Sequence, residues 1–207
     1  MGLWGTAHAS ADNKPKDKPT DENSDYKKQT VYATNSGWVR QAGTPANGND
    51  NTSAQPEVLV AIGDLAGSSS TTGLRAPTVT SMRFIKGTTA NTDLTAVDST
   101  GRILVEITYD EAVTVAGSPQ VVVANNNASG GGFGNYTLTY TATGSTANRI
   151  RFEATSQSLG NTDVLTLGGS NISLNGGTIS DTAVGGTTLA ASLVLSGISA
   201  VAVTIAS

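Results

Sequence analysis

The stretch that decides the fold is GRILVEITYD, residues 101–110. Every second residue from Ile103 to Tyr109 is apolar, and the residues between them include Glu106 and Thr108. A period of two is typical of a β-strand that buries one face and leaves the other face polar. We therefore expect a half-buried strand here, with Glu106 and Thr108 on the face opposite the core.

Two later stretches show the same alternation. NYTLTYTATG begins at Asn135, and RIRFEATS begins at Arg149. Three strands that each have one apolar face need a second sheet to cover them, which predicts an all-β, immunoglobulin-like β-sandwich. Turn residues separate further short apolar runs of the same kind. The expected strands are Val79–Ile85, Ile103–Asp110, Gln120–Ala124, Asn135–Thr143, Asn148–Thr155, Val164–Leu167, Asn171–Leu174 and Leu189–Leu195.

The composition excludes several classes of protein. Only 14% of the 207 residues are charged and 24 are glycine, which suits short strands and tight turns better than helices. The absence of cysteine excludes disulfides, thiolate catalysis and cysteine-containing zinc sites, and it favours assembly in a reducing cytoplasm. A net charge of −4 argues against binding to nucleic acid. No apolar run reaches 18 residues, so no membrane span is predicted.

The charges are unevenly distributed along the chain. Residues 1–50 contain six Lys or Arg residues and six Asp or Glu residues, so their charges cancel. After Thr155 the only charged side chains are Asp163 and Asp181. A surface so poor in charge is typical of a protein that is packed in an array or is present in many copies.

Residues 1–56 are predicted to form a long extended N-terminal arm. This range is rich in proline and in polar residues, and it contains too little apolar area to fold alone. Sparse aromatic and aliphatic residues in such a chain indicate contacts with a partner, because aromatic residues dominate interface energetics. The alternative for Trp38 is that it folds back onto its own sandwich. The predicted partner-binding residues of the arm are Leu3, Trp4, Val31, Tyr32, Trp38 and Val39.

The remaining chain divides into three parts. Residues 57–76 are interpreted as a short strand and a linker, residues 77–197 as the sandwich, and residues 198–207 as a C-terminal strand. An uncharged, apolar strand at the end of a chain is prone to aggregate unless it is paired. This strand either completes the protein's own sheet or adds to a neighbour. Its predicted partner-binding residues are Val201, Val203 and Ile205.

The sequence predicts no catalytic residues, no metal site and no cofactor. His8 is the only histidine and lies in the arm, where a Ser–His–Asp mechanism would need a third group to hold its imidazole within hydrogen-bond reach of a serine. Asp110 and Glu111 are neighbours at the end of a strand, so they point to opposite faces and are expected in a solvated turn. Carboxylates such as Asp98 and Asp163 lie near turns but lack the D-x-D-x-D-G spacing of a calcium loop. The chain is therefore not expected to be an enzyme.

Two resemblances add to these observations. RILVEITYDEAV, YTLTYTATG and DVLTLGGSNISLNGGTISD resemble the bacterial immunoglobulin-like repeats of surface and phage proteins, over about half of the chain. The family pattern includes an L-x-L-x-F/Y-(D/S)-E-x-V strand, and it implies a fold rather than a partner. MGLWG, ADNKPK and VYATNSGWV are similar to the N-terminal arms of virion structural proteins of marine tailed phages.

Together these observations predict a non-enzymatic bacteriophage structural protein located in the virion. It would decorate or cement the capsid through its arm, as a homo-oligomer or multicopy array bound to the major capsid protein or to other virion proteins. The alternative is a host-surface or carbohydrate-binding adhesion module of a phage neck, tail or fibre. Its expected contact residues would be Tyr26, Phe133 and Tyr136.

Overall fold

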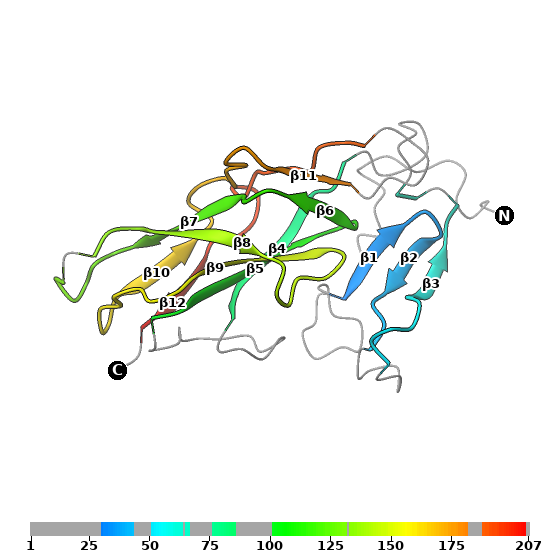
Figure 1. Ribbon diagram of the computed structural model, residues 1–207. Coiled ribbons are helices and arrows are strands. Elements are labelled where there is room, and N and C mark those ends of the chain that lie inside the picture. The colour runs from blue at the N-terminus through cyan, green and yellow to red at the C-terminus, as the bar shows by residue number, and fades with distance from the viewer. Residues whose placement is uncertain are drawn as a thin grey trace. The chain divides into compact units, whose positions relative to one another are not determined.

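The computed structural model describes residues 30–43, 51–63, 65–66, 76–85, 101–131, 133–181 and 188–205. These residues form twelve strands and no helix, which confirms the all-β prediction (Figure 1). The strands are β1 (Val31–Thr34), β2 (Gly37–Arg40), β3 (Glu57–Ala61), β4 (Val79–Ile85), β5 (Ile103–Tyr109), β6 (Val113–Ala116), β7 (Gln120–Asn125), β8 (Tyr136–Thr141), β9 (Arg149–Ala154), β10 (Val164–Leu167), β11 (Thr178–Asp181) and β12 (Val201–Thr204).

The strands are arranged in three sheets. One sheet has seven strands in the order β12-β10-β7-β8-β9-β5-β4, one has the order β1-β2-β3, and β6 pairs with β11. The two edge strands of the seven-stranded sheet, β4 and β12, lie in contact, so this sheet curls nearly to closure. The three strands on which the sandwich prediction rested, β5, β8 and β9, are therefore neighbours in one strongly curled sheet that covers much of its own core.

The chain divides into two compact units. The first unit contains residues up to Thr78 together with Tyr109–Thr114 and Ser180–Ser192. The second unit contains Val79–Thr108, Val115–Ile179 and Leu193–Ser207, and it holds the seven-stranded sheet except for Tyr109. The units are described separately below.

The core of the second unit follows the strand register. Val105 lies opposite Phe152 and Ile107 lies opposite Ile150 across the β5–β9 pair, and all four side chains are at most 1% exposed. Phe152 also meets the ring of Tyr140 edge-on, with ring centroids 6.4 Å apart. Directly opposed aromatic and β-branched pairs of this kind are the main stabilising contacts of a sheet.

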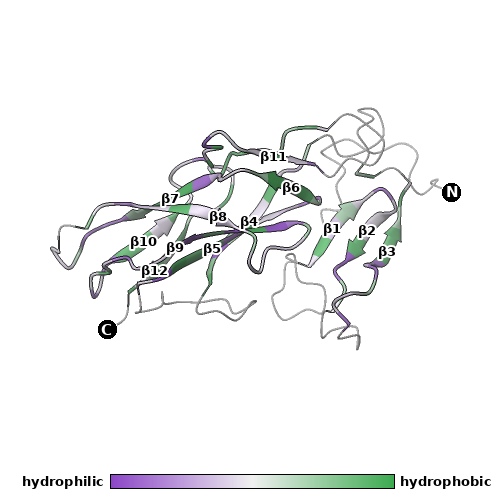
Figure 2. Cartoon of the chain, in the orientation of Figure 1, coloured by the Kyte–Doolittle hydropathy of each residue, from purple (hydrophilic) through white to green (hydrophobic). Residues whose placement is uncertain are grey.

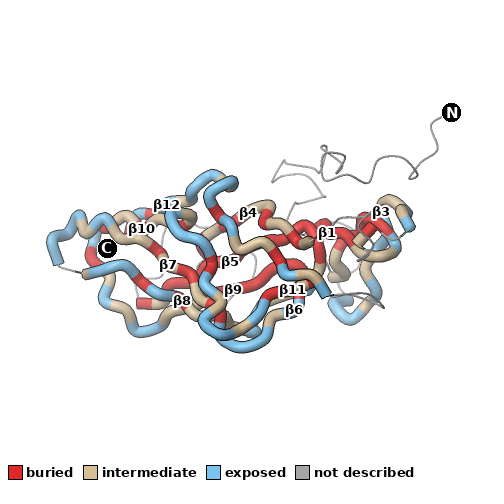
Figure 3. Tube along the Cα trace, turned by 90° about the horizontal axis from the view of Figure 1, so that it is seen from above, coloured by how far each residue is buried: buried red, intermediate tan, exposed pale blue. Residues whose placement is uncertain are grey.

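The expectation that β5 is half-buried is wrong. All seven of its residues are buried, including those on the face opposite the core, and Glu106 is 0% exposed (Figure 3). The alternation correctly identified the strand and its core face, but it did not show that the polar face is covered as well. Hydropathy along β5 accordingly does not match its burial, because hydrophilic residues interrupt a strand that is buried throughout (Figure 2).

Most of the strands expected from Val79 onward are present. β4 and β10 have the predicted limits, and β5, β7, β8 and β9 differ from them by one or two residues at an end. The predicted strands Asn171–Leu174 and Leu189–Leu195 form only isolated bridges, from Ser173 to Gln120 and from Ala190 to Ser180. β6 and β11 form where no strand was expected.

The C-terminal segment completes the protein's own sheet in this structure. β12 pairs antiparallel with β10, with Val203 opposite Leu165 and Val201 opposite Leu167. The backbone N–H of Ile205 continues this pairing by donating to the carbonyl of Asp163 at 2.8 Å. This is the first of the two alternatives that the sequence left open for residues 198–207.

In the first unit, residues 31–40 fold into a hairpin within the range predicted to be an extended arm. β1 and β2 pair around Asn35 and Ser36, and β3 adds to β2. The apolar residues of the hairpin and of residues 59–66 share a small core, which explains why this part of the range is folded. Its buried members are Val31, Ala33, Trp38 and Leu65.

Gly37 is required where the hairpin meets β3. Its φ of +122° favours glycine, and a Cβ there would lie 2.0 Å from the carbonyl oxygen of Val60. We expect Gly37→Ala to destabilise the three-stranded sheet by more than about 1 kcal/mol, measured by hydrogen exchange of its amides. Gly63→Ala is the matched control, because a Cβ at Gly63 meets nothing within 4 Å. Equal exchange in the two variants would contradict the close packing of β2 and β3.

Candidate functional site

The structure separates the predicted partner-binding residues into three groups. Leu3 and Trp4 lie outside the described residues. The four predicted residues of the hairpin are buried: Val31, Tyr32, Trp38 and Val39. At the C-terminus, Val203 and Ile205 are each 3% exposed and Val201 is intermediate.

Burial of the hairpin residues is produced by the chain itself. Val31 and Trp38 belong to the core of the three-stranded sheet, where Leu59 and Val60 also pack. Burial also raises the pKa of the Tyr32 phenol above its ordinary value. These residues therefore contribute to the stability of the first unit, and their side chains expose very little surface to a second protein.

The outer strand of this sheet, β3, is its most exposed part. Val58 is 48% exposed, and Glu57 pairs with Arg40, a guanidinium that is itself only 4% exposed. The register between β2 and β3 shifts at Leu59, which makes a β-bulge. Bulges at edge strands disfavour pairing with a further strand, so contacts here would come from side chains rather than from added backbone hydrogen bonds.

The opposite edge of the sheet is fixed to the segment that follows β5. The backbone N–H of Ala33 donates to the carbonyl of Asp110 at 2.7 Å, and Ala33 bridges to Glu111 in parallel orientation. Asp110 and Glu111 are 1% and 2% exposed, so the prediction of a solvated turn is wrong. The carboxylate of Asp110 accepts hydrogen bonds from the backbone N–H and the hydroxyl of Thr78, each at 2.7 Å.

Replacing Asp110 should show how much its carboxylate contributes to the free energy of unfolding. In Asp110→Asn the amide nitrogen cannot accept a hydrogen bond, so one of the two Thr78 donors loses its acceptor. We expect a loss of about 1–3 kcal/mol in the free energy of unfolding, measured with chemical denaturant. Thr78→Val, which removes only the hydroxyl, should cost less. Unchanged stability of Asp110→Asn would show that these contacts do not matter.

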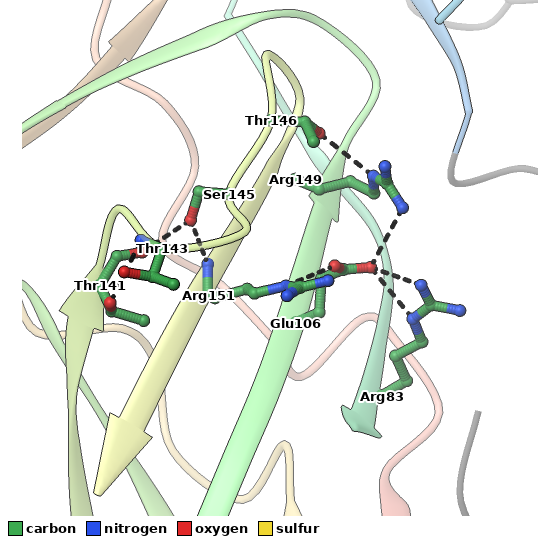
Figure 4. Close-up of polar contacts among 8 residues, drawn as sticks. All are labelled: Arg83, Glu106, Thr141, Thr143, Ser145, Thr146, Arg149 and Arg151. Atoms are coloured by element: carbon green, nitrogen blue, oxygen red, sulfur yellow. Dashed lines mark hydrogen bonds and ion pairs between the residues drawn. The ribbon is translucent and has the colours of Figure 1, made fainter. Parts of the chain in front are cut away.

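A second polar cluster lies in the seven-stranded sheet, on the face of β4, β5 and β9 opposite the core. Three guanidinium groups surround the carboxylate of Glu106 (Figure 4). Arg83 donates from Nε at 3.0 Å and from Nη2 at 2.7 Å to Oε1, and Arg151 donates from Nε to Oε2 at 3.0 Å. Arg149 Nη1 forms an ion pair with Oε1 at 3.7 Å.

This cluster was not predicted, although the sequence contains a signal for it. Arg149 and Arg151 alternate along β9, and the register places them opposite Thr108 and Glu106 of β5. Burial lowers the pKa of Arg149, the charge of Glu106 opposes this shift, and the charges of Arg83 and Arg151 add to it. Carboxylates that are fully engaged by arginines or threonines are structural groups, and neither Glu106 nor Asp110 is placed for acid–base chemistry.

A third polar cluster fixes the loop between β7 and β8. The carboxylate of Asp163 accepts from the backbone N–H of Ser129 at 2.8 Å and from Asn125 Nδ2 at 3.0 Å. The hydrogen bond from Ser129 is the main cause that lowers the pKa of Asp163, and burial opposes this shift. Near the same loop, the Tyr136 hydroxyl donates to the carbonyl of Ser158 at 2.6 Å.

The lowered pKa of Asp163 predicts a response to acid. A depressed folded-state pKa contributes stability that is present above the unfolded pKa, about 3.9, and is lost as pH falls through the folded value. We expect the amide resonance of Ser129 to shift as the pH is lowered below about 4. Asp163→Asn should abolish this titration. An Asp163 carboxyl that titrates at its ordinary pKa would contradict the contact.

The chain shows no similarity that assigns a function. Comparisons with protein families, with curated proteins and with solved structures found no match. Within the described ranges, no group of three or more His, Cys, Asp or Glu side chains could hold a metal ion. None of the described segments forms a helix long and apolar enough to cross a membrane.

Proposed function

We propose that this protein is a non-enzymatic structural component of a phage particle, which decorates or cements the capsid through residues near its N-terminus. One contrast carries the proposal. The apolar residues of the hairpin are buried in the protein's own sheet, whereas Leu3 and Trp4 belong to a charge-balanced polar sequence that precedes it. An aromatic residue in such a sequence is suited to fill a pocket on a partner.

Three further observations support this proposal. The chain after Thr155 has only two charged side chains, which suits a protein held in a dense array. The all-β body is consistent with the resemblance to immunoglobulin-like repeats, and we retain that finer assignment as part of the proposal. The short N-terminal motifs resemble those of virion structural proteins, for which the expected partner is the major capsid protein or another virion protein.

The structure also changes which residues we assign to the contact. The four predicted partner-binding residues of the hairpin are buried in the first unit: Val31, Tyr32, Trp38 and Val39. We therefore now assign the partner contact to Leu3 and Trp4. A single such anchor binds weakly, but many copies on one particle act together.

Deletion of residues 1–29 tests the proposal directly. The truncated chain should unfold at the same denaturant concentration as the full chain, because all described strands remain. It should, however, fail to sediment with particles purified from the phage that carries the gene, while the full chain sediments with them. Sedimentation of the truncated chain at full occupancy would refute a contact through these residues.

The adhesion alternative receives less support. Of its expected contact residues, Tyr136 is 6% exposed and its hydroxyl is bonded to Ser158, Phe133 is half-buried, and Tyr26 lies outside the described residues. A buried, hydrogen-bonded tyrosine does not offer a ring on which a sugar could stack. We therefore propose no second function.

A further inference from the structure

The cluster around Glu106 carries more positive than negative charge. Its three guanidinium groups and single carboxylate sum to +2, in a chain whose net charge is −4. All four side chains are largely removed from water: Arg83 is 14% exposed, Arg149 6%, Arg151 3% and Glu106 0%. Positive charge that is concentrated in a site with little water is not screened as it would be at the surface.

The hydrogen bonds of Arg151 are incomplete. Its Nε donates to Glu106, and the turn at Gly144 packs closely against its Nη1, because a Cβ on Gly144 would lie 2.1 Å from that atom. Its Nη2 is buried and has no acceptor. A buried N–H of a charged group that has no acceptor destabilises the fold, so such a group calls for an ion or a water molecule.

The other charged groups identify the kind of acceptor. Glu106 receives four contacts from the three arginines, three of them on Oε1, and neither of its oxygens accepts from Arg151 Nη2. The three arginines also repel one another, because like charges are held close together around one carboxylate. Burial is the main cause that lowers the pKa of Arg149, and the charges of Arg83 and Arg151 add to it. An anion would accept a hydrogen bond from Arg151 Nη2 and would also lower the repulsion between the arginines. A neutral water molecule would accept the hydrogen bond but would not lower the repulsion.

We propose that Arg151 Nη2, in the cluster that Arg83, Arg149 and Arg151 form around Glu106, binds a small monovalent inorganic anion, for which chloride is the probe. A compact anion suits this place better than a phosphate or sulfate, because the groups around it are nearly inaccessible to water. The bound charge reduces the sum of the cluster from +2 to +1. The ion therefore acts as a structural component of the sheet face formed by β4, β5 and β9.

Chloride-35 NMR of the full chain tests this site. Exchange of chloride with a protein site broadens the bulk chloride line in proportion to the protein concentration. We expect excess broadening for the wild type, competition by bromide, and loss of the excess in Arg151→Gln. Arg102→Gln is the matched control, because Arg102 pairs with Glu153 in a more exposed position, and it should keep the broadening. No excess for the wild type, or an equal excess in Arg151→Gln, would overturn the proposal.

A second measurement covers the possibility that Arg151→Gln does not fold. Crystals of the wild-type protein soaked in sodium bromide should give an anomalous peak within hydrogen-bond distance of Arg151 Nη2. A water molecule at that place, with no anomalous signal, would overturn the proposal without any variant.

Discussion

Replacing Glu106 with glutamine is expected to lower the free energy of unfolding by about 3–5 kcal/mol, because it removes one partner of a buried ion pair. Three arginine side chains that are at most 14% exposed then lose the carboxylate on which they converge. For a chain of this length the change corresponds to a fall of about 6–20 °C in Tm, which differential scanning calorimetry measures.

Glu153→Gln provides the matched control. Glu153 pairs with Arg102 in the same sheet, but both side chains are about one-fifth exposed. A partly exposed pair contributes only about 0–1 kcal/mol, so this variant should change the Tm little. Similar losses in the two variants would show that burial of the Glu106 cluster does not determine its contribution.

Replacing Trp38 with alanine is expected to cost about 3–5 kcal/mol, because it removes the largest side chain from the core of the three-stranded sheet. Trp38 is 5% exposed, and Leu59 and Val60 of β3 pack against the core to which it belongs. Hydrogen exchange of the β1, β2 and β3 amides measures this loss separately from the stability of the seven-stranded sheet.

Trp4→Ala is the counterpart of this variant. Under the proposed function it should reduce binding to particles and leave the unfolding transition unchanged, because Trp4 serves the partner rather than the fold. Trp38→Ala should lower the stability of the three-stranded sheet. At temperatures where that sheet is still formed, this variant should bind particles normally. If a fully folded Trp38→Ala variant lost particle binding while Trp4→Ala bound normally, the contact would belong to Trp38, and its assignment to Trp4 would be wrong.

The sequence predicted the strands well wherever alternation and turn residues occurred together. β4 and β10 have the expected limits, because two apolar residues flank a polar one in each strand and glycine or proline lies close by. By contrast, Leu189–Leu195 contains apolar residues but forms a β-bridge only at Ala190 within the described residues. Further backbone hydrogen bonds of this segment go to Pro77 and Ile172, which belong to no strand. A period of two indicates that a segment is extended, but it does not show that a neighbouring strand is present.

The hairpin of residues 31–40 was not predicted, because the polar, proline-rich composition of residues 1–56 was given more weight than the short apolar segments within them. Residues 31–40 lie in a range rich in proline and polar residues, yet VYAT and GWVR flank an Asn-Ser pair and are both rich in apolar residues. That arrangement is a hairpin signal on a short scale. The edge strand β1 of the hairpin contacts Asp110 and Glu111, which are distant from it in the sequence. The local sequence pattern of the hairpin therefore gave no sign of this contact.

The buried polar groups were the least predictable part of the candidate site. Glu106 was assigned to a polar face, but whether that face is covered depends on which strands become neighbours. The same applies to Asp110, whose carboxylate accepts a hydrogen bond from Thr78, a residue that lies 32 positions earlier in the chain. Pairing between distant segments determines whether such a polar side chain is buried, and the local period of a strand does not predict that pairing.

A cryo-electron microscopy map of the intact phage particle tests the central claim most directly. Under the proposed function, we expect the all-β body to project from the capsid and Leu3 and Trp4 to lie in density against a capsid subunit. The side chains of Val31, Tyr32, Trp38 and Val39 should remain inside the body, as they are here. A map in which these four residues insert into a neighbouring protein, or in which the chain is absent from the particle, would contradict the account.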